Sequence, residues 1–136
     1  MQAILAFDET MIGSDGIPLG NHPHPRLWGT FPRVLGHYSR DLGLFPLETA
    51  VWKMTGLTAR NFHLAGRGTL ALGQAADVVV FDAAAVADRA TYERPMQAAA
   101  GIDAVLVNGS IAWQLGRHTG ARSGQVITRH DGRGAP

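Results

Sequence analysis

Hydrophobic and polar positions along the first half of the chain repeat at the spacing of α-helices. Between Phe31 and Leu42 the apolar residues fall on one helical face, with Thr30 as the expected N-cap. A second stripe runs from Phe45 to Thr55, with Gly56 as the expected C-cap. Residues Thr58–Phe62 predict one more short helical turn.

The N-terminal residues before these helices have a different pattern. Met1–Phe7 is an apolar stretch that we interpret as the end of a helix. Thr10–Gly13 predicts a short buried strand, which a Ser-Asp-Gly turn at residues 14–16 closes. The Pro- and His-rich residues from Ile17 to Trp28 predict a loop.

After Gly66 the pattern changes to that of strands. The β-branched run Asp77–Asp82 and the run from Ile102 to Val107 predict two strands. Asn108-Gly109 is a strong signal for a two-residue hairpin, with Ser110–Gln114 as the returning strand. Residues 126–128 predict a short edge strand, and residues 130–136 a frayed tail. The chain is therefore expected to be α+β.

Composition narrows the class of protein. Hydrophobic residues make up 46% and charged residues 17% of 136 residues, which is typical of one globular domain. A net charge of +1 gives no electrostatic reason to expect nucleic acid or membrane partners. Cysteine is absent, which excludes disulfides and thiolate ligands. Without an apolar run of membrane-spanning length or a signal-peptide pattern, we expect a cytoplasmic protein.

Several segments resemble known enzymes. Gly73–Asp82 and Ile102–Gly109 resemble the amidohydrolase superfamily as a whole. A narrower resemblance, to its zinc-dependent N-acyl-D-amino-acid deacylases (the D-aminoacylases), rests on four further segments: Gly13–Gly16, His24–Gly36, Trp52–Ala59 and Val86–Asp88. Together the resemblance extends from about Ile12 to Arg129.

This resemblance implies an α/β parent fold, a metal-dependent hydrolase barrel joined to a small β-sandwich. A (β/α)8 barrel needs about 250 residues, so 136 residues cannot hold one. Residues 1–66 are expected to be the C-terminal end of the barrel, with its last strand and the helices after it. Residues 67–136 are expected to be the C-terminal strands of the small β domain. The chain would then be a segment of a longer enzyme.

The implied activity is cleavage of the amide of N-acyl-D-amino acids to a D-amino acid and a carboxylate, with zinc in the parent enzyme. The family's His-x-His pair, its Cys and its later His ligands have no counterpart before Asp15. We therefore expect no metal in this chain and no activity from it alone. Unclosed sheets and missing partner segments further predict a homo-oligomer, or pairing with an N-terminal segment.

Asp15 is the candidate catalytic residue. A carboxylate after the last barrel strand lies at the catalytic face, where the resemblance implies that it takes a proton from metal-bound water and later gives it to the leaving amine. On local sequence alone, Ser-Asp-Gly is better interpreted as an ordinary turn, because Asp and Gly are common turn residues, and it is the extended motif around it that favours the catalytic role.

Arg26 is the candidate substrate-binding residue. Its planar guanidinium could bind the substrate's α-carboxylate in bidentate fashion, as the resemblance implies. The alternative is an exposed or structural arginine.

Other chemistry-bearing residues have structural interpretations. His22 and His24 have ligand-like spacing, but no third ligand is evident, so we expect them to form hydrogen bonds or face solvent. Glu48 and Lys53 are expected on a solvated helix face. Five aromatic residues are expected in the core rather than on a binding surface: Trp28, Phe31, Trp52, Phe62 and Phe81.

Two other functions stay open. The chain could be a stand-alone binding or assembly module derived from the fold, or a segment of another amidohydrolase such as a cyclic amidase. An upstream reading frame with His-x-His and Cys would favour the deacylase. The long block from Arg26 to Gly36 argues against the cyclic amidase.

Overall fold

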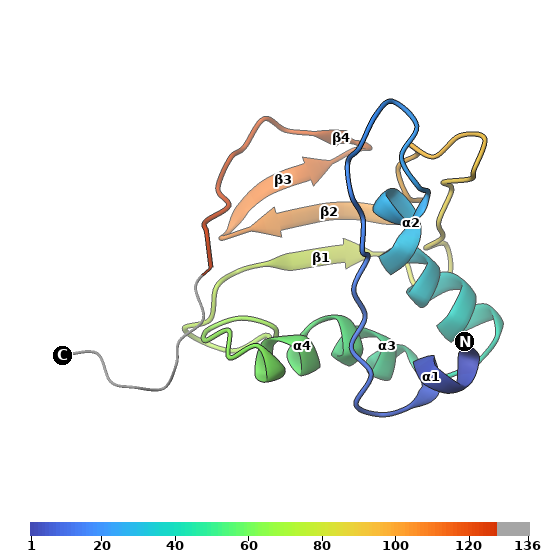
Figure 1. The fold of residues 1–136 in the computed structure, drawn as a ribbon. Coiled ribbons are helices and arrows are strands. Elements are labelled where there is room, and N and C mark those ends of the chain that lie inside the picture. Colours follow the sequence, from blue (N-terminus) through green and yellow to red (C-terminus); the bar gives the residue numbers. More distant parts are fainter. Residues whose placement is uncertain (128–136) are drawn as a thin grey trace.

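The protein has a helical part followed by an antiparallel sheet, as the sequence pattern predicts. A computed structural model describes residues 1–127, in which the sheet lies beside the helices (Figure 1). The predicted frayed tail at residues 130–136 lies outside the described residues. Within the described range, no helix is long and apolar enough to cross a membrane.

The helical part is one short N-terminal helix followed by four consecutive helical segments. They are α1 (Gln2–Ala6), α2 (Arg26–Arg33), the π-helix η1 (Val34–Asp41), α3 (Leu47–Met54) and α4 (Gly56–Asn61). α2 and η1 follow each other without a break, and π-helical winding of this kind is rare in proteins.

The predicted start of the first long helix was wrong by five residues. α2 begins at Arg26, and the Pro25 carbonyl accepts the N–H groups of Trp28 and Gly29. Thr30 is not the N-cap, because it lies inside the helix and its hydroxyl donates to the Arg26 carbonyl at 2.8 Å. Pro25 lacks a capping side chain, so no conventional start signal marks this end of the helix.

Gly56 has a different role from the predicted C-cap. It is the first residue of α4, and Thr55 ends α3. A Cβ atom at Gly56 would collide with the Trp52 ring. The glycine therefore lets the Trp52 indole lie directly against the backbone, and a larger residue would force the ring to move.

Thr10–Gly13 does not form the predicted strand. The segment is irregular, and the Ile12 N–H donates to the Lys53 carbonyl at 3.2 Å. A strand exists only where a neighbouring strand completes its ladder. Within residues 1–127, Thr10–Gly13 pairs with no strand, although Ile12 is buried as predicted.

The sheet confirms the predicted strands and hairpin. Its order is β1 (Val78–Phe81), β2 (Ile102–Val107), β3 (Ser110–Gln114) and β4 (Arg117–His118), all antiparallel. Asn108 and Gly109 both have positive φ, 47° and 80°, which is the signature of a type I′ turn.

The edge strand is not where it was expected. Residues 126 and 127 are not in a strand, and Thr128 lies outside the described residues. The edge is β4, which a second two-residue turn joins to β3. Leu115 and Gly116 have φ of 54° and 75° there. Leucine rarely adopts positive φ, so this turn carried no sequence signal.

Polar contacts anchor the first hairpin. Asp77 accepts the Asn108 N–H at 2.8 Å and pairs with Arg67, which also donates to the Asn108 side chain at 2.8 Å. The Asn108 N–H and then Arg67 hold the pKa of Asp77 below its ordinary value, although burial opposes this shift. These contacts therefore favour the charged form of the carboxylate, which fixes the turn.

The core joins the two parts of the chain. Its buried apolar residues come from the N-terminal segment, η1, the start of α3 and the connection after β1: Ile12, Val34, Leu35, Phe45, Ala50 and Val86. Phe81 packs against this cluster, as expected of a core aromatic. The other four aromatics predicted for the core are exposed instead: Trp28 (42%), Phe31 (44%), Trp52 (40%) and Phe62 (52%).

Val86 holds the helical part against the sheet. A Cβ atom at Gly36 would collide with the Val86 carbonyl, and one at Gly101 would lie 2.6 Å from the Val86 nitrogen. The Val86 backbone therefore runs between a helix glycine and a glycine next to β2. Arg40 also donates to the Val86 carbonyl at 2.7 Å.

The connection between β1 and β2 continues beside α2 and η1, as Figure 1 shows. Asp88 pairs with Arg33 at 3.1 Å, and a Cβ atom at Gly29 would lie 3.2 Å from the Asp88 Cβ. Farther along, Tyr92 contacts the loop that precedes α2. Residues 83–92 of this connection thus contact η1, α2 and the loop before α2 in turn.

Lys53 was wrongly predicted to be solvated. Its side chain is fully buried, with 0% exposure, and its ammonium donates to the Phe7, Asp8 and Thr10 carbonyls. The Asp8 and Thr10 contacts are 3.2 and 3.4 Å long. A buried ammonium requires such acceptors, because it has left water. Glu48, by contrast, is exposed as predicted.

We expect Lys53→Met to lower the free energy of unfolding by about 2–4 kcal/mol, because it removes a charged donor and leaves buried carbonyls without a partner. Glu48→Gln, on the exposed face of the same helix, should change it by less than about 0.5 kcal/mol. Urea unfolding at one fixed protein concentration tests both. Equal effects of the two substitutions would show that the Lys53 contacts contribute nothing.

Candidate functional site

The structure brings the two predicted site residues together. An Arg26 Nη atom lies 3.0 Å from an Asp15 carboxylate oxygen, so the two side chains form an ion pair. Asp15 comes from the turn after the irregular Thr10–Gly13 segment, and Arg26 is the first residue of α2. Their side chains are 77% and 41% exposed, respectively.

A close backbone approach sets this pairing. The Ser14 hydroxyl accepts the Gly16 N–H at 3.2 Å, and Asp15 adopts a left-handed φ of 49°. A Cβ atom at Gly16 would lie 2.9 Å from the Leu27 Cα. Because Leu27 follows Arg26, the glycine lets the turn reach α2 and places the Asp15 carboxylate beside the guanidinium. In the sequence, Gly16 is a turn residue and part of the resembling segment Gly13–Gly16, but its contact with Leu27 depends on the fold.

Another anion can replace Asp15 as the partner of Arg26 at a small cost in free energy. Exposed pairs of this kind contribute about 0–1 kcal/mol, because water and salt screen them. A free carboxylate of a small molecule could therefore replace Asp15 on the Arg26 guanidinium, with two parallel hydrogen bonds. The Asp15 carboxylate would then be available to accept a proton.

Two histidines and a tyrosine shape the loop beside this pair. His24 Nδ1 accepts the Arg26 N–H at 3.1 Å, and its Nε2 lies 3.1 Å from the Tyr92 hydroxyl. His22 Nε2 lies 2.6 Å from the Tyr92 carbonyl. The prediction that these histidines form hydrogen bonds is confirmed. Tyr92 was missed, because it lies 68 residues from His24 in the chain and only the fold brings them together.

The described residues offer no ready metal site. Nowhere in residues 1–127 do three His, Cys, Asp or Glu side chains gather closely enough to hold an ion. Asp15 is paired with a cation rather than with other ligands. Any metal that acts beside Asp15 would need ligands from elsewhere.

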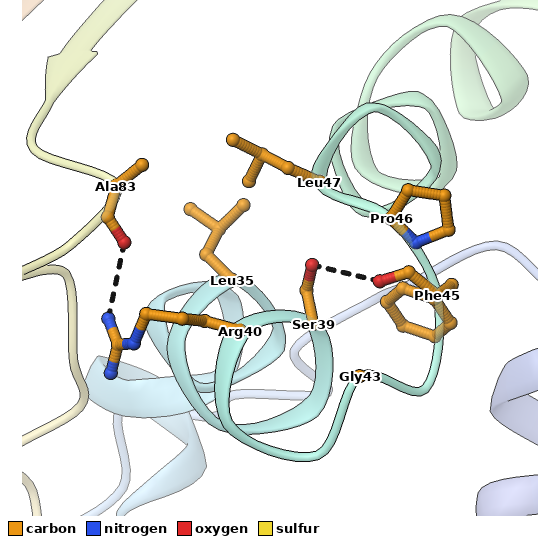
Figure 2. Close-up of a pocket in the computed structure, with 8 residues that line it drawn as sticks. All are labelled: Leu35, Ser39, Arg40, Gly43, Phe45, Pro46, Leu47 and Ala83. Atoms are coloured by element: carbon orange, nitrogen blue, oxygen red, sulfur yellow. Dashed lines mark hydrogen bonds between the residues drawn. The ribbon is translucent and has the colours of Figure 1, made fainter.

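The structure also has a recess of about 310 Å³, whose lining residues are drawn in Figure 2. Its walls come from η1, the start of α3 and the connection after β1, and include Leu35, Phe45 and Leu47. Ser39 donates to the Phe45 carbonyl at 3.0 Å at its edge, and Arg40 to the Ala83 carbonyl at 3.3 Å. Neither Asp15 nor Arg26 lines it, so we do not assign it to the candidate site.

The chain belongs to the amidohydrolase family, whose model matches residues 6–112. Among its relatives is a D-aminoacylase of Alcaligenes xylosoxydans xylosoxydans, 67% identical over 95% of this chain and 27% of the relative. An N-acyl-D-glutamate deacylase of the same organism is 64% identical over 73% of this chain and 20% of the relative. The resemblance to this group of deacylases is thereby confirmed.

Solved structures agree. A D-aminoacylase with a binuclear metal centre is 66% identical, with a TM-score of 0.92, over 94% of this chain and 27% of that protein. An N-acyl-D-glutamate deacylase of Bordetella bronchiseptica was solved with zinc and a phosphonate mimic of the reaction's tetrahedral intermediate. It is 50% identical, with a TM-score of 0.88, over 95% of this chain and 27% of that protein. This chain thus spans about a quarter of the length of these relatives.

We expect Gly16→Ala to separate Asp15 from Arg26, because the new methyl group would meet the Leu27 backbone. The free energy of unfolding should fall by about 1–3 kcal/mol, the usual cost of overpacking, and the Arg26 side-chain NMR signal should shift. Gly13→Ala is the matched control, since nothing lies within 4 Å of its Cβ position. If both variants shift the Arg26 signal equally, the Gly16 contact does not set the pair.

Proposed function

We propose that this chain is the C-terminal segment of a zinc-dependent hydrolase that cleaves the amide of N-acyl-D-amino acids, releasing a D-amino acid and a carboxylate. The observation that carries the proposal is the 67% identity to a D-aminoacylase over nearly the whole chain. The Bordetella relative was solved with zinc and a phosphonate mimic of the tetrahedral intermediate, which supports a metal-assisted hydrolysis.

Asp15 and Arg26 have distinct roles in this proposal. Arg26 binds the substrate's α-carboxylate and in doing so gives up its pairing with Asp15. Asp15, now free, takes a proton from the attacking water and delivers it to the leaving amine nitrogen. Zinc, held by residues outside this segment, would polarise the substrate carbonyl and activate the water. The exposed Asp15–Arg26 pair supports this exchange, because it costs little to open.

We infer the following division of the segment. Residues 1–66 are the C-terminal end of a hydrolase barrel, and residues 67–136 are the C-terminal strands of a small β-sandwich domain. The change from helices to strands after Gly66 supports this division.

The other two functions have less support. A cyclic amidase is disfavoured because the relatives described above act on N-acyl-D-amino acids by name. A stand-alone module differs from the deacylase segment in one measurable way: its Asp15 and Arg26 would contribute nothing to catalysis.

A segment swap tests the activity. The matching quarter of the Alcaligenes D-aminoacylase is replaced by this chain, and hydrolysis of N-acetyl-D-amino acids is measured with zinc. We expect activity, a kcat about 100- to 10,000-fold lower in Asp15→Asn, as for loss of a general base, and a KM about tenfold higher in Arg26→Lys, which loses bidentate binding.

Asp103→Asn is the control for the Asp15 variant, because Asp103 is an exposed carboxylate on β2. It should leave both constants unchanged. The 136-residue chain alone should release no acetate with zinc present. An active swap protein in which Asp15→Asn behaves like Asp103→Asn would contradict the catalytic role of Asp15.

The 136-residue chain is also expected to self-associate, or to pair with an N-terminal segment of such a hydrolase. Only eight apolar residues are buried in the described part of the chain, whereas twenty large ones are exposed. Exposed apolar surface on this scale favours association. Sedimentation at micromolar concentration should show a dimer or larger species. A stable monomer would instead favour the stand-alone module.

A further inference from the structure

Tyr92 contacts both histidines of the loop before α2. Its carbonyl oxygen can only accept, so the His22 Nε2 at 2.6 Å must donate to it. Its hydroxyl lies 3.1 Å from His24 Nε2, and the two rings meet edge to face with centroids 5.1 Å apart. One residue of the β1–β2 connection thus holds two points of this loop.

The other ring nitrogen of His24, Nδ1, holds the first residue of α2, Arg26. Nδ1 accepts the Arg26 N–H at 3.1 Å, so this nitrogen carries no proton in the neutral ring. Nε2 then carries the proton and donates to the Tyr92 hydroxyl. The His24 ring thereby connects Tyr92 to the backbone of the residue whose guanidinium faces Asp15.

Tyr92 itself is held in a turn. The Thr91 hydroxyl accepts the Arg94 N–H at 3.0 Å, and the Thr91 N–H donates to the Arg94 carbonyl at 3.2 Å. Five residues earlier, Ala87 pairs with Ala100 beside the sheet. The hydroxyl of Tyr92 is therefore presented to His24 by backbone that is tied at both ends.

We propose that His24 and Tyr92 are positioning residues, which hold the loop before α2 in the shape that presents Arg26 to the substrate carboxylate. The proposal rests on the substrate-binding role given to Arg26 above. Loss of either contact should let the first turn of α2 shift, which weakens substrate binding and leaves the proton transfer by Asp15 intact.

Three substitutions separate the contacts. Tyr92→Phe removes only the hydroxyl. His24→Asn keeps an acceptor near the position of Nδ1, because an asparagine oxygen accepts the N–H two residues on, but cannot reach Tyr92. His24→Ala removes both contacts. Tyr38→Phe is the matched control, since Tyr38 is the other tyrosine in the chain and its hydroxyl interacts with the Met1 sulfur and Arg33 rather than with the histidines of this loop.

NMR of the 136-residue chain gives a readout independent of catalysis. At a pH where the ring is neutral, His24 should carry its proton on Nε2, and Tyr92→Phe should shift the His24 ring nitrogens. The Arg26 amide should shift strongly in His24→Ala and weakly in His24→Asn. A His24 ring protonated on Nδ1 would overturn the proposal.

Kinetics of the segment-swap enzyme give the second readout. Tyr92→Phe and His24→Ala should raise KM about threefold to tenfold, the range that a neutral hydrogen bond supports, with kcat within about twofold. The KM of the double variant Tyr92→Phe, His24→Asn should exceed that of Tyr92→Phe by no more than about twofold, because the two substitutions remove the same contact between Tyr92 and His24. Tyr38→Phe should change neither constant.

The outcomes distinguish this proposal from the proposed function. If Arg26→Lys raises KM while Tyr92→Phe and His24→Ala behave like Tyr38→Phe, the positioning role is wrong and the deacylase function stands. If Arg26→Lys and Asp15→Asn also behave like the controls, the proposed function itself fails. A fall in kcat without a change in KM in the Tyr92 and His24 variants would also overturn the positioning role.

Discussion

The passage of the Val86 backbone between Gly36 and Gly101 is the constraint on which the rest of the structure depends. A Cβ atom at Gly36 would collide with the Val86 carbonyl, and one at Gly101 would collide with the Val86 nitrogen, so η1 and the start of β2 both approach the backbone of this one residue closely. Arg40 then donates to the carbonyl that Gly36 exposes. Val86 also belongs to the apolar core that joins the helical part to Phe81 and Ile102 of the sheet, so the close approach at this residue helps to set how the two parts pack.

After Val86, the connection between β1 and β2 makes further contacts with α2 and with the loop before it, next to Asp15 and Arg26. Asp88 lies against Gly29 and pairs with Arg33, which fixes the middle of α2. Beyond it, Tyr92 reaches the loop where α2 begins. The site thus depends on two kinds of contact. The turn that carries Asp15 packs locally on Leu27 of α2. The position of α2 itself depends on Asp88, which lies more than fifty residues along the chain from Arg33.

Local features were predictable from the sequence, and features that depend on distant chain segments were not. The Asn108-Gly109 hairpin followed from two residues that accept positive φ, and it is found as expected. The helices were recognised by their spacing, but the start of α2 was missed because Pro25 gives no side-chain cap. Asp15 and Arg26 were named individually, from local pattern and resemblance. Their ion pair, and the contact of Tyr92 with His24, required the fold.

The burial of Lys53 has a consequence for how such sequences can vary. Its three acceptors are main-chain oxygens of Phe7, Asp8 and Thr10, so its hydrogen bonds to that segment do not depend on the side chains there. Substitutions at those three positions leave the acceptors in place as long as the backbone keeps its path. In an alignment of related chains, position 53 would therefore hold a lysine without any covarying partner. Coevolution methods, which detect paired changes, would not register these contacts of a fully buried side chain.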